Sequence, residues 1–279
     1  MKIGAIIQAR TSSTRLPRKV LKPLPFNSNI TVLSQVIRRV KQSKLIDEVI
    51  VATTPKDDEI VDVAIAEEVP YYQGSLENVL ERYYEAACKN DLDVIVRLTS
   101  DNPCVDFKLV DNVIKSHLKL DVDYSSTSLI KSFPIGIGLE VINFDTLKKA
   151  YDEATEKFEK EHVTPFIYKS HPEEFKINKF KGDNDNSDIR ITLDTPQDYA
   201  LLCAVYDYLY EENNYFLLED ILELFSKKPW LKDINSEIIQ KKVFNNLKEE
   251  LDEVINLCDR QDLYKAKEFL EEKIEDYNE

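Results

Sequence analysis

Glycine is scarce in this chain of 279 residues, which contains only five. They are Gly4, Gly74, Gly136, Gly138 and Gly182. They form no G-x-G-x-x-G pattern after a strand, and no G-x-x-x-x-G-K-S/T segment occurs anywhere. The chain therefore lacks the usual dinucleotide fingerprint and the P-loop, so a phosphate site must use another kind of loop.

Cysteine and histidine are also rare. The four cysteines lie far apart without a C-x-x-C pair, which argues against a disulfide framework and against a zinc ribbon. The three histidines are not spaced like a pair of metal ligands, which argues against a His-rich metal site.

Long hydrophobic runs are absent as well. No run reaches the roughly 18 residues of a membrane span. The apolar run Ile3–Ile7 is too short for a secretory leader, and no small-residue cleavage site follows it. Hydrophobic residues still make up 43% of the chain, enough for a full core. We therefore expect a soluble, cytoplasmic protein with no membrane partner.

Charge is unevenly distributed along the chain. The net charge of -15 argues against nucleic-acid binding, which needs a basic surface. Yet residues 1–46 contain ten Lys or Arg and no acid, which leaves 27 basic and 52 acidic residues in the remainder. A basic island on an acidic protein favours a local anionic ligand. Chance clustering together with a solvated helix face is the alternative.

Strand and helix patterns alternate through the first half. Apolar runs predict buried strands, and apolar spacing of three and four predicts helices. The strands are expected at 2–9, 47–53 and 93–98, and the helices at 30–40, 57–67, 75–89 (with Ser75 as the cap) and 107–118. Such alternation predicts an α/β fold with a mostly parallel sheet flanked by helices. Ligands bind beyond the carboxyl ends of such strands, so the loops at Gln8-Ala9-Arg10, Thr53-Thr54 and Thr99-Ser100-Asp101 should face one crevice.

The second half has a mixed pattern. Strands are expected at 140–144, 175–180 and 189–193, and helices at 145–154 and 195–210, with Thr195 as an N-cap. From Ser236 we expect an acidic helical hairpin that forms a C-terminal helical extension. This hairpin docks on the domain or on a second subunit; plain packing with solvated outer faces is the alternative. We therefore divide the chain into a catalytic domain, 1–228, and an acidic helical extension, 229–279.

The loop from Arg10 to Lys19 (RTSSTRLPRK) carries three Arg, one Lys and four hydroxyl side chains. Guanidinium forks, a lysine ammonium and hydroxyls are the groups that bind phosphate oxygens. The segment therefore has the chemistry to wrap a polyphosphate, although a solvated surface loop is the alternative.

Two carboxylates are candidate metal ligands. Asp101 follows a buried strand and Asp194 precedes a helix, so either can instead be a helix N-cap. Two carboxylates from distant segments commonly hold Mg²⁺ for phosphoryl transfer. The sequence alone does not show that they converge. The Asp121/Asp123 and Asp183/Asp185 pairs also look like metal motifs, but a strand start and a polar turn explain them.

Seven segments in order resemble the SpsF-like cytidylyltransferases of spore-coat polysaccharide synthesis, which are relatives of CMP-sialic acid and CMP-Kdo synthetases. The segments are IIQARTSSTRLPRKVL (6–21), IVATT (50–54), GSLENVLERYY (74–84), VRLTSDNP (96–103), FPIG (133–136), EHVTP (161–165) and RITLDTPQD (190–198). The likeness covers roughly residues 1–225, and the helical tail after about residue 230 lies outside it.

This resemblance implies a Rossmann-like nucleotidyltransferase that uses CTP and Mg²⁺. It implies a nucleotide-binding set of Gln8, Ala9, Arg10, Ser12, Ser13, Arg15, Lys19, Thr53, Thr54, Gly74 and Ser75. The implied catalytic residues are Arg10, Lys19, Asp101 and Asp194, with the two carboxylates as metal ligands. The implied acceptor residues are Arg97, Glu140, Glu161 and His162, although a lone His before Val-Thr-Pro is commonly a structural, hydrogen-bonded residue.

The chain departs from the family pattern at four positions. Ser12 and Arg18 stand where the first loop usually carries glycine. Ile135 replaces a common Arg, and Gly138 replaces an acid. The last two changes fall in the expected acceptor pocket and leave the acceptor's identity open.

The leading hypothesis is an enzyme that transfers CMP from CTP to an acidic sugar or another anionic acceptor, with release of pyrophosphate, in surface polysaccharide or glycoconjugate synthesis. A glycosyltransferase of similar fold is one alternative, although a basic loop of this size suits a triphosphate better. A non-catalytic nucleotide-binding assembly subunit is the other, although the retention of Asp101 and Asp194 argues against it. Because closed two-fold dimers are the commonest soluble oligomers, we expect a homodimer.

Overall fold

The computed structural model describes residues 1–238 and 247–278, which fall into two compact units, Met1–Ser236 and Glu237–Glu279. The first unit extends past residue 228, where we expected the boundary. The 3-10 helix Pro229–Asn235 packs on the two preceding helices and buries Leu231 and Asn235 in the same unit.

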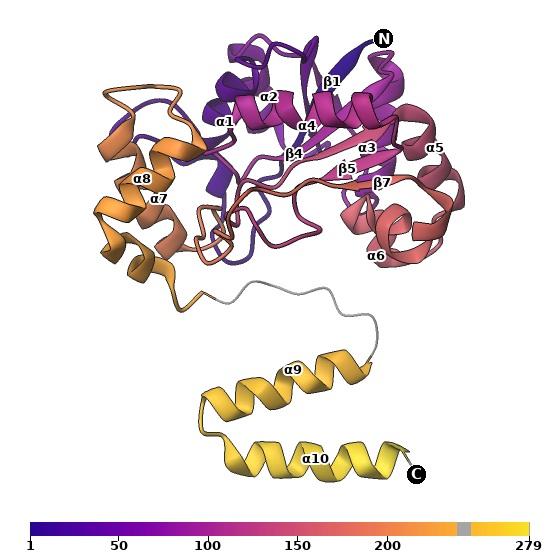
Figure 1. Cartoon of the computed structure of the whole chain (residues 1–279), viewed down its shortest axis with the longest axis vertical. Helices are drawn as coiled ribbons and strands as arrows, with labels where there is room; N and C mark the ends of the chain where they lie inside the picture. Colours follow the sequence, from indigo (N-terminus) through magenta and orange to yellow (C-terminus); the bar gives the residue numbers. More distant parts are fainter. Residues whose placement is uncertain (239–246, 279) are drawn as a thin grey trace. The chain divides into compact units, whose positions relative to one another are not determined.

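A seven-stranded, mostly parallel sheet forms the centre of the first unit (Figure 1). The strands are β1 (Ile3–Gln8), β2 (Glu48–Thr53), β3 (Tyr71–Gln73), β4 (Val94–Thr99), β5 (Tyr124–Ser126), β6 (Glu140–Asn143) and β7 (Ile177–Lys179). Their order is β3-β2-β1-β4-β6-β5-β7, and β6 is antiparallel to both of its neighbours. The predicted α/β class with a mostly parallel sheet is confirmed.

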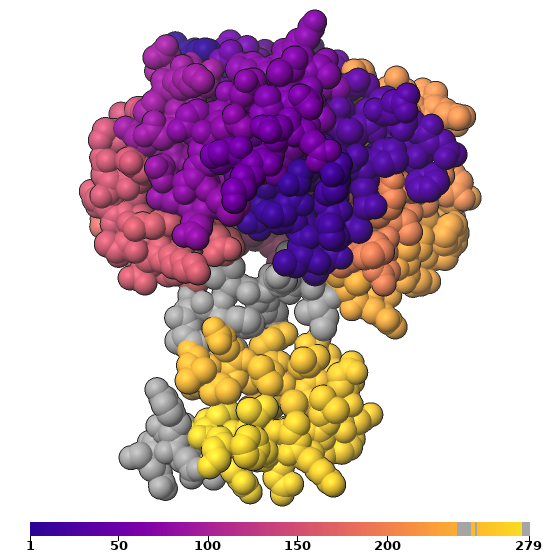
Figure 2. Space-filling model, turned by 180° about the vertical axis from the view of Figure 1, so that it is seen from behind, coloured from indigo at the N-terminus to yellow at the C-terminus, as the bar shows by residue number. Residues whose placement is uncertain are grey.

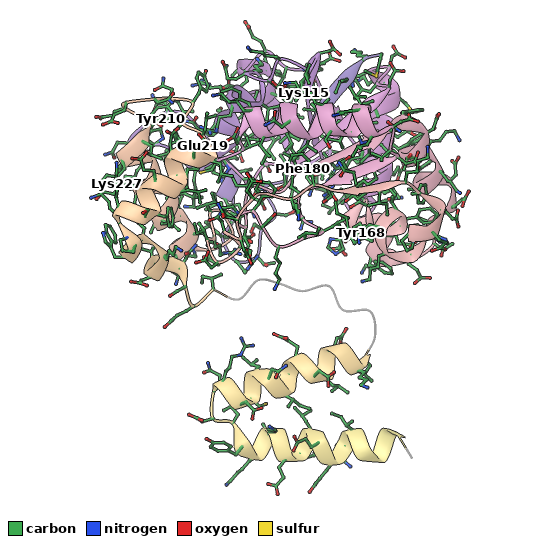
Figure 3. All side chains as sticks on the ribbon, viewed as in Figure 1. Lys115, Tyr168, Phe180, Tyr210, Glu219 and Lys227 are labelled. Atoms are coloured by element: carbon green, nitrogen blue, oxygen red, sulfur yellow. The ribbon has the colours of Figure 1, made fainter. Side chains whose placement is uncertain are left out.

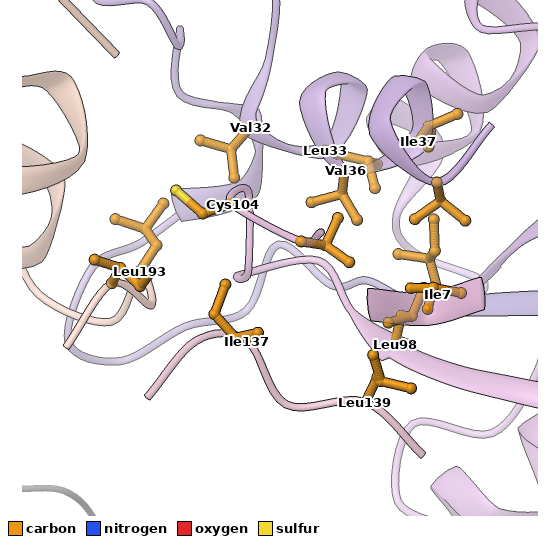
Figure 4. Packing of buried hydrophobic residues seen from close by; sticks show 14 of the residues in the cluster. Ile7, Val32, Leu33, Val36, Ile37, Leu98, Cys104, Ile137, Leu139 and Leu193 are labelled. Carbon is orange, nitrogen blue, oxygen red and sulfur yellow. The ribbon is translucent and has the colours of Figure 1, made fainter. Parts of the chain in front are cut away.

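Both faces of the sheet are covered by helices, which explains why the central strands β1, β2 and β4 are mostly apolar. One face packs on α1 (Val32–Val40), α2 (Asp58–Ala66), α4 (Phe107–Leu120), α7 (Pro196–Leu209) and α8 (Leu218–Lys227). The other packs on α3 (Val79–Lys89) and α5 (Phe144–Glu153), with α6 (Lys157–His162) against α3. Successive residues alternate between the faces: Ile7 joins the first cluster and Ile6 the second. Figure 4 shows Val36 and Ile37 of the first cluster near Ile7 and Leu98.

The three central strands end at the same level. Gln8, the last residue of β1, pairs with Ala52 of β2 and with Thr99, the last residue of β4. Their carboxyl ends therefore open onto one edge of the sheet, as the alternating pattern predicts.

Two predicted elements differ from the structure. Helix α3 begins at Val79 with Asn78 as its cap, and Ser75 instead accepts a hydrogen bond from the Asn78 amide at 3.0 Å. Residues 189–193 form no strand of the sheet, although Arg190 makes one isolated bridge to Ile135. The amide of Leu193 donates to the carbonyl of Asp101 at 2.8 Å, which draws this segment toward the end of β4.

The second unit is a pair of helices, α9 (Leu247–Arg260) and α10 (Tyr264–Asn278). The helices contact each other and bury Cys258, while Leu247, Val254, Leu257 and Phe269 stay exposed. Residues 239–246 of the expected hairpin lie outside the described residues. In the part of the chain that the structure describes, every helix is too short or too polar to cross a membrane.

Candidate active site

The loop that follows β1 is fastened to the start of α2 by Asp57. The buried Asp57 carboxylate accepts hydrogen bonds from the amide and hydroxyl of Thr11 and from the hydroxyl of Thr54. Burial acts to raise the pKa of Asp57, but these hydrogen bonds hold it below its ordinary value. The threonine hydroxyls expected near the nucleotide are thus engaged in fixing the loop.

The far part of the same loop lies at the surface beside α7. Figure 2 shows this indigo segment next to the orange helices, where Tyr199 donates to the carbonyl of Pro23 at 2.7 Å. The loop is therefore held at both ends. Ser12, which lies between these two points, and Arg10, which precedes Thr11, are exposed and can meet a ligand.

Lys19 links the two carboxylates that were proposed as metal ligands. Its ammonium lies 2.7 Å from Asp101 and 2.9 Å from Asp194. Arg15 and Arg190 contact the second oxygen of Asp194 at 2.9 and 3.0 Å. Burial lowers and the two carboxylates raise the pKa of Lys19, with a net rise. Burial raises the pKa of Asp194, but Lys19 and Arg15 bring it below its ordinary value.

Backbone contacts bring Asp101 and Asp194 together although they are 93 positions apart in the chain. The Asp101 carbonyl accepts the amide of Leu193 at 2.8 Å, one residue before Asp194. Neither carboxylate caps a helix: Asp106 caps α4, and Thr195 caps α7. Their side chains are therefore available to the loop cations and to a ligand.

A buried ion pair between Arg190 and Asp198 lies next to Asp194 and supports its position. Asp198 is fully buried and lies 2.9 Å from Arg190, which also contacts Asp194. Asn235 donates to Asp198 at 2.8 Å. Burial raises the pKa of Asp198, but the hydrogen bonds from Arg190 and Asn235 keep it below its ordinary value. We did not predict this support, because Arg190 and Asp198 lie in a matched segment without any assigned role.

The two carboxylates fit a divalent cation. Oxygen atoms from Asp101 and Asp194 already lie within hydrogen-bond distance of one ammonium, so a single small cation can reach both. Their side chains are 26% and 16% exposed, which leaves room for ligand oxygens. Carboxylate oxygens are the ligands that Mg²⁺ prefers, and one or two of them with substrate phosphates complete its usual shell.

Glu140 and Arg97 form a buried pair at the neighbouring strands. The carboxylate of Glu140 accepts hydrogen bonds from Arg97, from the hydroxyl of Tyr124 and, at 2.8 Å, from the hydroxyl of Thr164. Burial disfavours the Arg97 cation, but Glu140 raises its pKa above the ordinary value. Glu140 therefore holds Arg97 in place, and Tyr124 and Thr164 are partners that sequence reasoning missed.

His162 and Glu161 lie at the end of α6. Burial lowers the pKa of His162, although Glu161 acts to raise it and nearby Arg97 acts to lower it. His162 is half-buried, whereas Glu161 is exposed. Tyr168, on the segment after α6 (Figure 3), stacks on Tyr124 with ring centroids 6.2 Å apart. The structure thus places His162 near Arg97 and adds Tyr168, which we had not singled out.

The remaining predicted residues lie around the same edge. Gly74 donates its amide to the carbonyl of Thr53 at 2.9 Å, and an added Cβ would approach the Tyr72 ring to 2.6 Å. Any side chain there would displace Tyr72. Asp121 and Asp123, in contrast, have structural roles. Asp121 is the C-cap residue of α4, and the Asp123 carboxylate accepts a hydrogen bond from the amide of Lys176 at 2.7 Å.

A profile of the cytidylyltransferase family matches residues 4–269. The chain belongs to this family. It is a nucleotidyltransferase. The match passes residue 230 and reaches into α10, so our expectation that the helical tail lies outside the family resemblance was wrong.

Individual relatives agree with this assignment. An uncharacterized protein of Methanocaldococcus jannaschii is 39% identical over 86% of this chain and 97% of its own length. The spore coat polysaccharide biosynthesis protein SpsF of Bacillus subtilis is 36% identical over 72% of this chain and 85% of its own. A solved cytidylyltransferase from Leptospira borgpetersenii is 30% identical with a TM-score of 0.79, and the match covers 86% of this chain and 100% of that one.

Arg18 explains how this cytidylyltransferase forms its first loop without the glycine that family members usually carry there. Its backbone adopts the left-handed conformation, with φ 57 and ψ 27, and its amide donates to the carbonyl of Thr11 at 3.1 Å. That conformation is the one for which glycine is favoured. The loop therefore keeps a left-handed turn, immediately before Lys19, and pairs the Arg18 side chain with Glu59.

Proposed function

We propose that this cytidylyltransferase acts in the cytoplasm and transfers CMP from CTP to an anionic acceptor such as an acidic sugar, with Mg²⁺ and with release of pyrophosphate. The observation that carries the proposal is the contact of Lys19 with both Asp101 and Asp194 beside the basic loop. Two carboxylates and the cations of the basic loop thus lie together at one edge of the sheet, which supports the proposal.

The basic loop supplies the triphosphate site. Arg10, Arg15 and Lys19 provide charged donors, and Ser12 and Ser13 provide hydroxyls. In the structure the Arg15 and Lys19 cations contact Asp194. Binding of CTP would bring these cations onto phosphate oxygens, which accept from Arg in a bidentate manner and from Lys as a point charge.

Asp101 and Asp194 would hold Mg²⁺ at the point where they now share Lys19. When bound there, Mg²⁺ neutralises charge on the α-phosphate and on the departing pyrophosphate. Arg190 keeps Asp194 oriented toward that position, because Asp198 holds Arg190 from the other side.

The reaction is an in-line displacement at the α-phosphorus. An acceptor oxygen forms a bond to phosphorus, and the bond from phosphorus to the α,β-bridging oxygen breaks to release pyrophosphate. The chain's part is to align the acceptor and to hold the charged groups, since an anionic acceptor oxygen needs little help from a general base.

Arg97 is the proposed acceptor-binding cation. Glu140 fixes its guanidinium, and its Nη2 lies 3.5 Å from the side-chain oxygen of Gln8 at the end of β1. His162 and Tyr168, whose pKa values the Arg97 charge acts to lower, are assigned to the same part of the site. The name of the Bacillus subtilis relative supports a role in polysaccharide synthesis.

Pyrophosphate release tests the proposal directly. Each of the four nucleoside triphosphates is offered with Mg²⁺ and a panel of acidic sugars, sugar phosphates and neutral sugars. We expect release with CTP and an anionic acceptor. Release of a nucleoside diphosphate from a nucleotide sugar, or an absence of turnover together with tight nucleotide binding, would contradict it.

A further inference from the structure

Arg82 lies on the first turn of α3, beneath the edge where the strands end. The next residue, Tyr83, donates to the carbonyl of Leu98 at 2.9 Å and lies 3.4 Å from the carbonyl of Ile6. These carbonyls are close to the ends of β4 and β1, so the start of α3 is fixed at the active-site edge. Arg82 has no role in the site as described above.

Arg82 is buried without a counterion. Its side chain is 2% exposed, and its Nη1 donates to the carbonyl of Ser75 at 2.8 Å. Its Nε is buried with no hydrogen-bond partner, and within residues 1–238 and 247–278 no carboxylate forms an ion pair with Arg82. Burying an uncompensated charge is unfavourable by several kcal/mol.

The neighbouring charges make this arrangement more unfavourable. Burial lowers the pKa of Arg82, and the nearby Arg10 cation lowers it further. Asp57 is the acid that acts in the opposite direction, but its carboxylate is taken up by Thr11 and Thr54. The Arg10 charge thus adds to the unfavourable environment of the Arg82 guanidinium, and a bound anion would relieve this repulsion.

The other buried arginines that the structure describes make more contacts within the protein, although Arg39, like Arg82, has no acidic partner and one guanidinium nitrogen without a hydrogen bond. Arg190 contacts Asp194 and Asp198, and the half-buried Arg97 contacts Glu140, although its Nε has no hydrogen-bond partner. Arg39 donates to the carbonyls of Val105 and Phe216 and lies over the Phe216 ring at 4.4 Å. Arg82 has one carbonyl contact, so its environment differs from those of the structural arginines.

We propose that Arg82 is a further nucleotide-binding residue, which donates from its guanidinium to a phosphate oxygen of CTP and shares that phosphate with Arg10. The inference rests on the proposed function, because it takes CTP as the anion. A phosphate supplies the negative charge that a buried guanidinium between Arg10 and the strand ends otherwise lacks. Arg forms short, charge-assisted hydrogen bonds to phosphate.

Calorimetric binding of CTP, CMP and cytidine to four proteins tests this role. The proteins are the full-length wild type, Arg82→Gln, Arg82→Lys and the control Arg38→Gln, which removes a guanidinium paired with Glu67 away from the site. We expect Arg82→Gln to weaken CTP binding by about ten- to hundredfold, since a hydrogen bond to a charged group has this value. Cytidine binding should not change, Arg82→Lys should lie between, and the control should match the wild type.

Three outcomes would overturn the role of Arg82 while CTP still binds the wild type. The first is an unchanged CTP affinity in Arg82→Gln, and the second is an equal loss of affinity for cytidine and for CTP in that variant. The third applies if Arg82→Gln does not fold: Arg82→Lys then binds CTP as tightly as the wild type. A wild type that binds no CTP would instead contradict the proposed function. The two failures are therefore distinguishable.

Discussion

Lys19 takes a position between two carboxylates that a divalent cation would also favour. Its ammonium is one positive charge within 2.9 Å of both Asp101 and Asp194. It neutralises part of the repulsion between the two acids. We therefore expect Lys19 to serve the folded protein as a counterion and the bound nucleotide as a phosphate ligand.

Removing either carboxylate charge should stop turnover. We expect Asp101→Asn and Asp194→Asn to lower pyrophosphate release by at least 100-fold at saturating Mg²⁺, in the range typical of a lost electrostatic catalytic group. Asp194→Asn should also lower the melting temperature more than Asp101→Asn, because Asp194 contacts three cations and Asp101 contacts Lys19.

The matched control is Asp121→Asn, since Asp121 is an exposed acid at the end of α4. Its activity and melting temperature should stay close to those of the wild type. Activity in both site variants comparable to that of the control would rule out the two-carboxylate assignment.

The loop cations should distinguish CTP from CMP. Arg15→Ala and Lys19→Ala each remove a charged donor at the expected position of the β- and γ-phosphates. We expect CTP affinity to fall by about tenfold or more in each variant, from a loss on the order of 1.5–3 kcal/mol, with a smaller change for CMP. Titration calorimetry measures both ligands. Equal losses would place the two side chains away from the terminal phosphates.

The residue types of the site could be predicted from sequence, but their contacts could not. Lys19, Asp101 and Asp194 stand in recognisable segments, and the positions of the strand ends predict that the loops of Lys19 and Asp101 share one edge, but they do not place Asp194 there. Local sequence patterns do not determine which residues far apart in the sequence come into contact. Glu140, for example, accepts hydrogen bonds from Arg97 and Thr164, which lie far from it in the sequence. These contacts depend on the pairing of β6 with β4 and on the path of the chain after α6.

At the scale of elements, the sequence predicts the helices and strands that have long apolar patterns. It does not predict short strands or segments whose conformation depends on tertiary contacts. The cap of α7 at Thr195 follows from local chemistry and is confirmed. Strand β3 spans three residues and lies at the sheet edge, so it carries no alternation to detect. The alternating apolar residues at 189–193 resemble a strand, but the backbone of this segment binds Asp101 and Ile135 instead of joining the sheet.

The loop after β1 and the start of α2 should respond together to acid through Asp57. Its pKa is lowered in the folded state from an ordinary value of 3.8. Its contribution to stability is therefore complete above about pH 5 and is lost as the pH falls through the lowered folded-state pKa. We expect Asp57→Asn to reduce the free energy of unfolding by about 1–3 kcal/mol at pH 7.

Denaturant titrations of wild type and Asp57→Asn from pH 7 to pH 3 check this expectation. The difference between the two proteins should shrink as the pH falls below about 4. Asp58→Asn, which alters the exposed neighbouring residue, is the control and should follow the wild-type profile. A difference that stays constant with pH would show that the Asp57 charge does not hold the loop.

At the scale of the whole chain, the alternating strand and helix patterns predict the α/β class of the first unit. The second unit is notable for the apolar side chains that it leaves exposed. Strand order and the antiparallel placement of β6 are set by tertiary packing and could not be predicted from periodicity. The helical pair α9–α10 keeps Leu247, Val254 and Phe269 exposed. Apolar side chains at this density on an amphipathic pair favour burial against a partner surface.

We therefore predict that residues 237–279 contribute to self-association, with a homodimer as the expected assembly, and not to nucleotide binding. The test compares the full chain with a chain that ends at Ser236. This end point keeps Leu231 and Asn235, which are buried in the first unit, and Asn235 supports Asp198. We expect the shortened protein to retain CTP affinity within about twofold and to show the mass of a monomer by light scattering, whereas the full chain shows the mass of a dimer.

The control for the shortened protein is a full-length variant with Val254→Ser and Phe269→Ser, two changes on the exposed apolar face of α9 and α10. It should lose association to a similar degree while keeping the helical signal of the tail in circular dichroism. If the shortened protein is folded but has lost CTP affinity, the tail belongs to the active site. A dimer mass for both variants would place the dimer contact on the first unit.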